Sequence, residues 1–62
     1  MIVELIVEDQ YGTDGPQKGT RGVVVETRKH SEDGKYYAIY FDGFLTRGVF
    51  YAFEEMVEVI QK

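Results

Sequence analysis

The chain carries few side chains of the kinds that catalyse reactions, and they stand where turns are expected. His30 is the only histidine, and Ser31 follows it in a charged run. Catalysis by such residues needs a nucleophile and a base held together in a cleft, whereas serine among charged residues is typical of turns. We therefore expect His30 to be a solvated surface residue at a hairpin tip.

Three adjacent pairs of acidic residues are the next candidates for acid–base chemistry. A carboxyl group becomes a general acid at neutral pH only where burial or a neighbouring charge shifts its pKa. Each pair falls at the end of an expected strand or in a loop, where nothing removes it from water: Glu8–Asp9, Glu32–Asp33 and Glu54–Glu55. We expect no enzymatic activity.

Metal and phosphate sites also lack their usual sequence patterns. The chain has no cysteine, and the acids of residues 9–14 do not alternate as the ligands of a calcium loop do. The glycines of residues 12–22 precede an expected strand, so no helix N-terminus is available to hold a phosphate. We expect neither a metal nor a cofactor.

Length and composition are those of a small globular domain. The chain has 62 residues, 44% hydrophobic and 29% charged, with a formal net charge of −4. A chain this short buries only about 60% of the surface that its unfolded form exposes, so we expect one domain, residues 1–62, held by packed aliphatic and aromatic side chains. Met1 leads into an apolar run broken by Glu4, without the basic leader of a signal peptide. We expect a soluble, cytoplasmic protein without membrane contact.

The apolar residues fall into five short runs, and this pattern predicts an all-β domain. Asp-Gly dipeptides, which favour tight turns, separate several of the runs. Glu54 to Met56 is expected as one short 3-10 turn before the last strand. The expected strands are residues 2–7, 23–27, 36–41, 48–53 and 57–60, which together make a strongly bent antiparallel sheet.

Alternation within these strands predicts which side chains fill the core, because successive side chains of a strand point to opposite faces. The expected core residues are Val3, Leu5, Val7, Tyr37, Ile39, Phe41 and Phe53.

Two loops and one glycine-rich corner link the strands. Gly19 and Gly22 bracket the corner, and we expect both at positive φ, which other residues adopt only at a cost. Residues 8–18 form a long polar loop. Residues 28–35 form a charged hairpin closed at Asp33–Gly34.

The corner resembles the KOW motif, whose features are a Lys-Gly pair, a second glycine three residues on and a strand valine. Lys18, Gly19, Gly22 and Val24 match these features. KOW domains are SH3-like barrels of ribosomal proteins and transcription elongation factors. The resemblance implies a five-stranded SH3-like barrel and admits contact with RNA, the ribosome or RNA polymerase.

A second resemblance spans more of the chain. A glycine corner at residues 19–24 is followed by an aromatic strand that ends in Phe-Asp at residues 40–42, and then by an aromatic strand that leads into Val-Glu-Val within residues 51–59. This order is similar to that of the small SH3-like subunit of photosystem I and of the variable chain of ferredoxin-thioredoxin reductase. Those proteins are non-catalytic and dock on a larger partner. The resemblance implies an accessory subunit.

The aromatic residues give the main functional prediction. A domain this small cannot bury the rings of five tyrosines and four phenylalanines. Those left outside either cover the wall of the barrel, as apolar groups do on most protein surfaces, or form a protein-binding patch, since Tyr, Phe and Arg are enriched in interfaces. We predict protein binding through Tyr36, Tyr40, Phe44, Leu45, Arg47 and Phe50.

Nucleic-acid binding is the alternative. Base stacking on the exposed rings needs basic residues beside them. Lys18 and Arg21 share the glycine corner, while Arg28, Lys29 and Lys35 share the hairpin, so two small positive spots exist, each diluted by nearby acids. The net charge of −4 disfavours this alternative, because phosphate binding depends on Lys and Arg.

Overall fold

The structure, a computed structural model, describes residues 1–30, 32 and 34–62, except for the side chain of His30. It is all-β, and the described residues contain no α-helix. The turn predicted before the last strand is confirmed as η2 (Glu54–Met56), whereas the other 3-10 turn, η1 (Leu45–Arg47), lies in a predicted loop. The strands are β1 (Ile2–Leu5), β2 (Arg21–His30), β3 (Gly34–Phe41), β4 (Phe50–Phe53) and β5 (Val57–Gln61).

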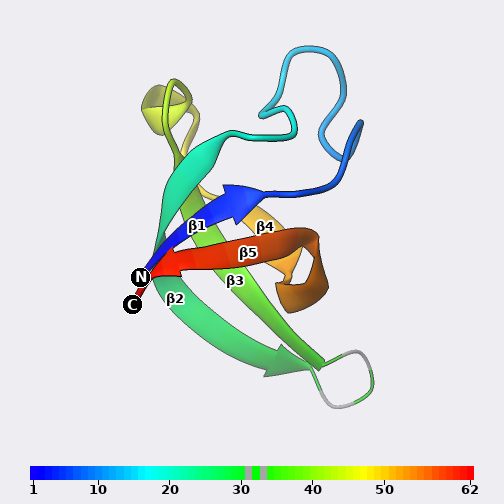
Figure 1. Ribbon diagram of the computed structural model, residues 1–62, viewed down its shortest axis with the longest axis vertical. Coiled ribbons are helices and arrows are strands. Elements are labelled where there is room, and N and C mark those ends of the chain that lie inside the picture. Colours follow the sequence, from blue (N-terminus) through cyan, green and yellow to red (C-terminus); the bar gives the residue numbers. More distant parts are fainter. Residues whose placement is uncertain (31, 33) are drawn as a thin grey trace.

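The five strands form one antiparallel sheet in the order β4-β3-β2-β1-β5 (Figure 1). The long strand β2 pairs with β1 through its first residues and with β3 along most of its length, with an irregularity between Val24 and Glu26. A strand that pairs with both of its neighbours and contains a bulge lets a sheet bend sharply. The arrangement is compatible with a small barrel of the SH3-like type.

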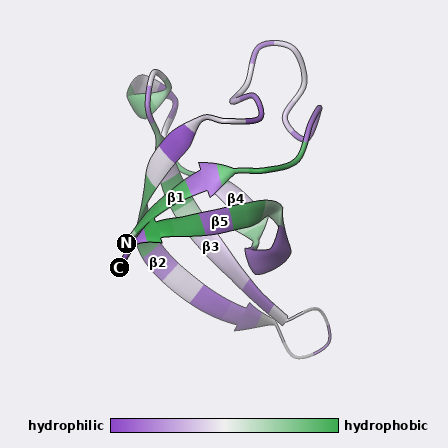
Figure 2. Ribbon diagram, in the orientation of Figure 1, coloured by the Kyte–Doolittle hydropathy of each residue, from purple (hydrophilic) through white to green (hydrophobic). Residues whose placement is uncertain are grey.

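The core lies inside the bend of the sheet. Val3, Leu5, Ile39 and Phe41 are almost completely buried, and Tyr37 is 8% exposed, so alternation predicted these positions correctly. Val7 is only partly buried against them. In Figure 2, β1 and β5 are largely hydrophobic, while the far half of β2 is largely hydrophilic and runs beside β3 towards the hairpin.

Strand β4 faces the opposite way from the prediction. Phe53, expected in the core, is 37% exposed, whereas Ala52 is 2% exposed. Ala52 stands opposite Tyr37 and Phe50 opposite Ile39, both of which are core residues. Because side chains alternate, a shift of one residue moves every side chain of a strand to the other face. Phe50 and Ala52 therefore face inward, and Tyr51 and Phe53 face outward.

The two glycines of the corner are needed for different reasons. Gly19 has a φ of 96°, as predicted. Gly22 is not at positive φ, and that expectation was wrong; instead, a Cβ atom there would lie 2.6 Å from Ile39 Cγ2 and 2.7 Å from the Tyr40 carbonyl oxygen. The missing side chain of Gly22 leaves room for the Ile39 side chain and the Tyr40 carbonyl group of the neighbouring strand β3.

The tip of the β2–β3 hairpin is only partly described. The ladder between the strands reaches the pair His30 and Gly34, while Ser31, Asp33 and the side chain of His30 lie outside the described residues. None of the described helical turns has the length and hydrophobicity needed to cross a membrane.

Candidate functional site

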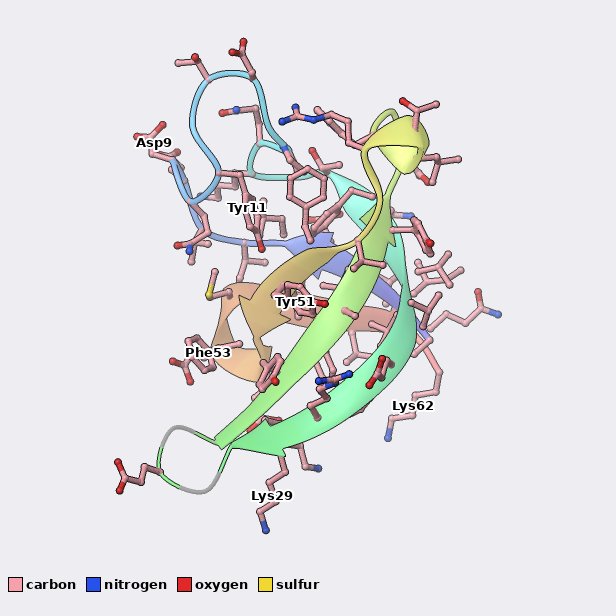
Figure 3. All side chains as sticks on the ribbon, turned by 180° about the vertical axis from the view of Figure 1, so that it is seen from behind. Asp9, Tyr11, Lys29, Tyr51, Phe53 and Lys62 are labelled. Atoms are coloured by element: carbon pink, nitrogen blue, oxygen red, sulfur yellow. The ribbon has the colours of Figure 1, made fainter. Side chains whose placement is uncertain are left out.

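Strands β3 and β4 place four aromatic rings on the outer face of the sheet. Alternation along β3 directs Tyr36, Ala38 and Tyr40 outward, and Phe53 and Tyr51 of β4 stand opposite Tyr36 and Ala38. Tyr51 is 55% exposed and Tyr40 37%. We call Tyr36, Tyr40, Tyr51 and Phe53 the outer aromatic face. Figure 3 shows the molecule from the side on which Tyr51 and Phe53 lie.

Three of these rings support one another through edge contacts. The centroid of Tyr36 lies 6.0 Å from that of Tyr51, with 67° between the rings, and 6.3 Å from that of Phe53, with 74° between the rings. Such T-shaped pairs are favourable because the positive edge of one ring meets the negative face of the other. The contacts fix the orientation of rings that remain open to solvent.

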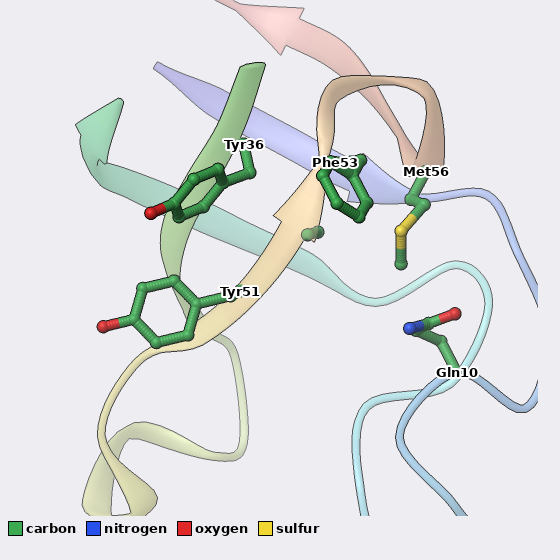
Figure 4. A pocket seen from close by; sticks show the side chains of 6 residues that line it. Gln10, Tyr36, Tyr51, Phe53 and Met56 are labelled. Atoms are coloured by element: carbon green, nitrogen blue, oxygen red, sulfur yellow. The ribbon is translucent and has the colours of Figure 1, made fainter. Parts of the chain in front are cut away.

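A hollow of about 220 Å³ lies between these rings and the long β1–β2 loop. Figure 4 shows the rings of Tyr36 and Tyr51 on one side, Phe53 and Met56 drawn next to each other, and Gln10 on the side of the long loop. Ala52 also lines the hollow, because this small side chain leaves space at the free edge of β4. We call the hollow lined by Gln10, Tyr36, Tyr51, Ala52, Phe53 and Met56 the groove.

The charges around the groove are unequally distributed. Asp9 adjoins Gln10 in the sequence, and Glu54 and Glu55 lie between Phe53 and Met56; all three acids are exposed. Among the described residues that line the groove there is no lysine or arginine. The cations on the Tyr36 side are Lys35, which is exposed and precedes Tyr36 in the sequence, and Arg28, which stands opposite Tyr36. Arg28 Nε donates to Glu26 at 2.5 Å, and this hydrogen bond, with a smaller one involving Tyr36, raises the pKa of Arg28 above its ordinary value.

The structure separates the six residues predicted for protein binding. Tyr36 and Tyr40 lie on the outer aromatic face. Leu45 is 60% exposed but belongs to η1, which follows the opposite end of β3 from Tyr36. Phe44 and Phe50 were expected to face outward, which is wrong, since both pack against the core and their rings meet edge-on at 6.0 Å.

Arg47 was also predicted at the interface, and in the structure it holds the long loop. Its guanidinium lies 6.0 Å from the ring centroid of Phe44 and 5.6 Å from that of Phe50, and it donates a hydrogen bond to the Asp14 carbonyl oxygen. The contact joins η1 to a loop more than thirty residues away in the sequence.

Tyr11 ties the same loop to β4. Its hydroxyl donates to the Tyr51 carbonyl oxygen at 2.7 Å, and its ring centroid lies 5.2 Å from that of Phe50. Burial raises the pKa of Tyr11 to about 12. The tether covers one polar group of the free edge of β4 and keeps Gln10 beside the groove.

The five basic residues of the alternative prediction form two separate groups. Arg21 lies at the corner and pairs with Glu4 at 3.2 Å, and Lys18 is exposed in the preceding turn. In the hairpin, Arg28 pairs with Glu26, while the exposed residues Lys29 and Lys35 stand directly opposite each other.

Sequence reasoning missed the groove because it assigned β4 to the wrong face. Tyr51 and Phe53 carry most of the exposed aromatic surface there, and neither was predicted as a binding residue. The informative signal was Ala52, since a small residue fits opposite the large core side chain of Tyr37, and this pairing leaves both neighbours of Ala52 outside.

Within the described ranges, no three His, Cys, Asp or Glu residues are grouped closely enough to hold a metal ion. Comparisons with protein-family models, with curated proteins and with solved structures found no match for this chain.

Proposed function

We propose that this protein is a non-catalytic interaction module of the SH3-like type that binds another protein through its outer aromatic face. It would act in the cytoplasm as an adaptor, accessory subunit or inhibitor. The observation that carries the proposal is the exposure of Tyr51, at 55%, beside the rings of Tyr36 and Phe53 and next to a hollow. Tyr and Phe are enriched in the cores of protein interfaces, where charged residues are depleted.

The energetics of the outer aromatic face also favour a binding role. An exposed ring contributes little to the stability of the free protein, whereas an aromatic anchor buried at an interface costs about 2 kcal/mol or more of binding free energy when it is truncated. The ring of Tyr51 is already oriented by Tyr36, so less side-chain entropy is lost on binding. The resemblance to two non-catalytic SH3-like subunits, one of photosystem I and one of ferredoxin-thioredoxin reductase, supports the same class of function.

Affinity capture from an extract of the producing cells tests the proposal. We expect the wild-type protein and a Leu45→Ser variant to capture the same partner, and a Tyr51→Ser variant to lose it. Leu45 is a matched control because it is as exposed as Tyr51 but lies in η1. Thermal unfolding of all three proteins excludes loss of folding as the cause. Capture of the same partner by Tyr51→Ser would contradict the proposal.

Nucleic-acid binding is the second candidate, supported by the KOW-like corner and by one observation. Lys29 and Lys35 stand opposite each other in the hairpin ladder, with Arg28 and Tyr36 forming the next pair. Positive charge therefore adjoins a ring that can stack on a base. This candidate requires RNA binding that weakens steeply with salt and with Lys29→Gln, whereas the protein-docking proposal requires neither.

A further inference from the structure

We propose that the groove receives a lysine or arginine side chain from an extended segment of a basic partner protein. The inference rests on the proposed function and names the chemistry of the partner. It depends on the size of the groove, on the side chains that line it and on the charges that surround it.

The size of the groove fits one side chain. Its volume is about 220 Å³, whereas pockets for cofactors and other small molecules usually occupy roughly 300–1,000 Å³. The groove opens on the free edge of β4, between the outer aromatic face and the long loop. An extended segment that passes along this edge can insert a single long side chain.

The walls of the groove suit a cation carried on an apolar stem. Tyr36 is steeply inclined to both Tyr51 and Phe53, so rings in different orientations line the same space. Ring faces attract ammonium and guanidinium groups within about 6 Å. Lys and Arg also have aliphatic stems that pack on apolar surface, and Ala52 and Met56 supply that surface.

The surrounding charges favour a cation over a neutral side chain. Exposed Asp9 and Glu54 adjoin lining residues on the two sides of the groove, and Glu55 adjoins Met56. On the Tyr36 side, the positive charge of Arg28 is offset by its ion pair with Glu26, which leaves Lys35, next to Tyr36, against these three acids. With a net charge of −4, the whole chain adds to the attraction of a basic partner.

Titration with short peptides, followed by NMR of the ring protons of Tyr36, Tyr51 and Phe53, tests this inference. The probes are blocked pentapeptides Gly-Ser-X-Ser-Gly in which X is lysine, arginine or norleucine, the last being an uncharged side chain with a similar stem. We expect the lysine and arginine peptides to shift these rings and to bind about fivefold or more tightly than the norleucine peptide. Equal or tighter binding of the norleucine peptide, or no ring shift with any peptide, would overturn the inference.

Two variants that each remove one negative charge test whether the carboxylates beside the groove strengthen peptide binding. Glu54→Gln removes a carboxylate beside the groove and should weaken binding of the lysine peptide about threefold. Asp42→Asn makes the same change in charge after the far end of β3 and should leave binding unchanged. Equal weakening by both variants would overturn the inference, because the general negative field would then explain the binding.

The peptide titration and the capture experiment test different claims, so a negative result in one leaves the other claim standing. If Tyr51→Ser loses its captured partner but the norleucine peptide binds best, the groove takes an apolar side chain and only the inference is overturned. If the lysine peptide binds as expected but Tyr51→Ser still captures the same partner, the proposed docking function is overturned instead.

Discussion

Replacing Tyr11 by phenylalanine removes one hydroxyl and leaves its ring packing in place. The hydroxyl donates to the Tyr51 carbonyl oxygen at 2.7 Å, and a hydrogen bond of this kind contributes about 1 kcal/mol net. We expect Tyr11→Phe to lower the free energy of unfolding by about 1 kcal/mol and the melting temperature by roughly 4–8 °C, the usual effect in a domain of this size. Urea denaturation followed by far-ultraviolet circular dichroism measures the loss.

The same variant has a defined pH dependence. Burial raises the pKa of Tyr11 from 10.0 to about 12 in the folded protein. Because the folded-state pKa lies above the unfolded-state value, the stabilisation is fully present below pH 10 and is lost as the pH rises towards 12. The difference in stability between the wild-type protein and Tyr11→Phe should therefore shrink over that interval.

Tyr51→Phe is the matched control, since it removes a hydroxyl from a ring that is 55% exposed. It should change the free energy of unfolding by less than about 0.5 kcal/mol. Equal stability of Tyr11→Phe and the wild-type protein at pH 7 would refute the tether between the long loop and β4. A deficit that stays constant up to pH 12 would contradict the raised pKa of Tyr11.

Three further variants test the packing. Gly22→Ala should cost about 1–3 kcal/mol of unfolding free energy in urea denaturation because its methyl group meets Ile39 at 2.6 Å; an unchanged midpoint would contradict this. Phe50→Ala should cost about 2–3 kcal/mol because its ring packs against the core, and a loss confined to partner binding would instead support its predicted surface role. Arg47→Met should speed hydrogen exchange at the Gly15 amide, and unchanged exchange would argue against the Asp14 contact.

The sequence predicted the buried side chains best where the two faces of a strand differ clearly in hydrophobicity. In β3, Tyr37, Ile39 and Phe41 form the buried set, as alternation predicted. In β4, the run Phe-Tyr-Ala-Phe places an aromatic residue on both faces, so hydrophobicity could not decide the orientation. The orientation of β4 is set instead by its pairing with β3, in which the bulky core residue Tyr37 stands opposite Ala52.

Strand length and loop contacts were beyond sequence reasoning for other reasons. The charged residues Arg28 and Lys29 were assigned to a hairpin loop, but they continue β2 and stand opposite Tyr36 and Lys35 of β3. Charged side chains do not disfavour a strand at these positions because both side chains are exposed. The contacts of Tyr11 with Tyr51 and of Arg47 with Asp14 join distant segments, and no local pattern encodes them.

Site-specific photo-crosslinking in the producing cells tests the docking face most directly. Benzoylphenylalanine is introduced in place of Tyr51 on the outer aromatic face and, separately, in place of the equally exposed Leu45 in η1. We predict a discrete crosslinked partner from position 51 and none from position 45. Crosslinking from position 45 alone, or the same products from both positions, would contradict the assignment of the outer aromatic face as the binding surface.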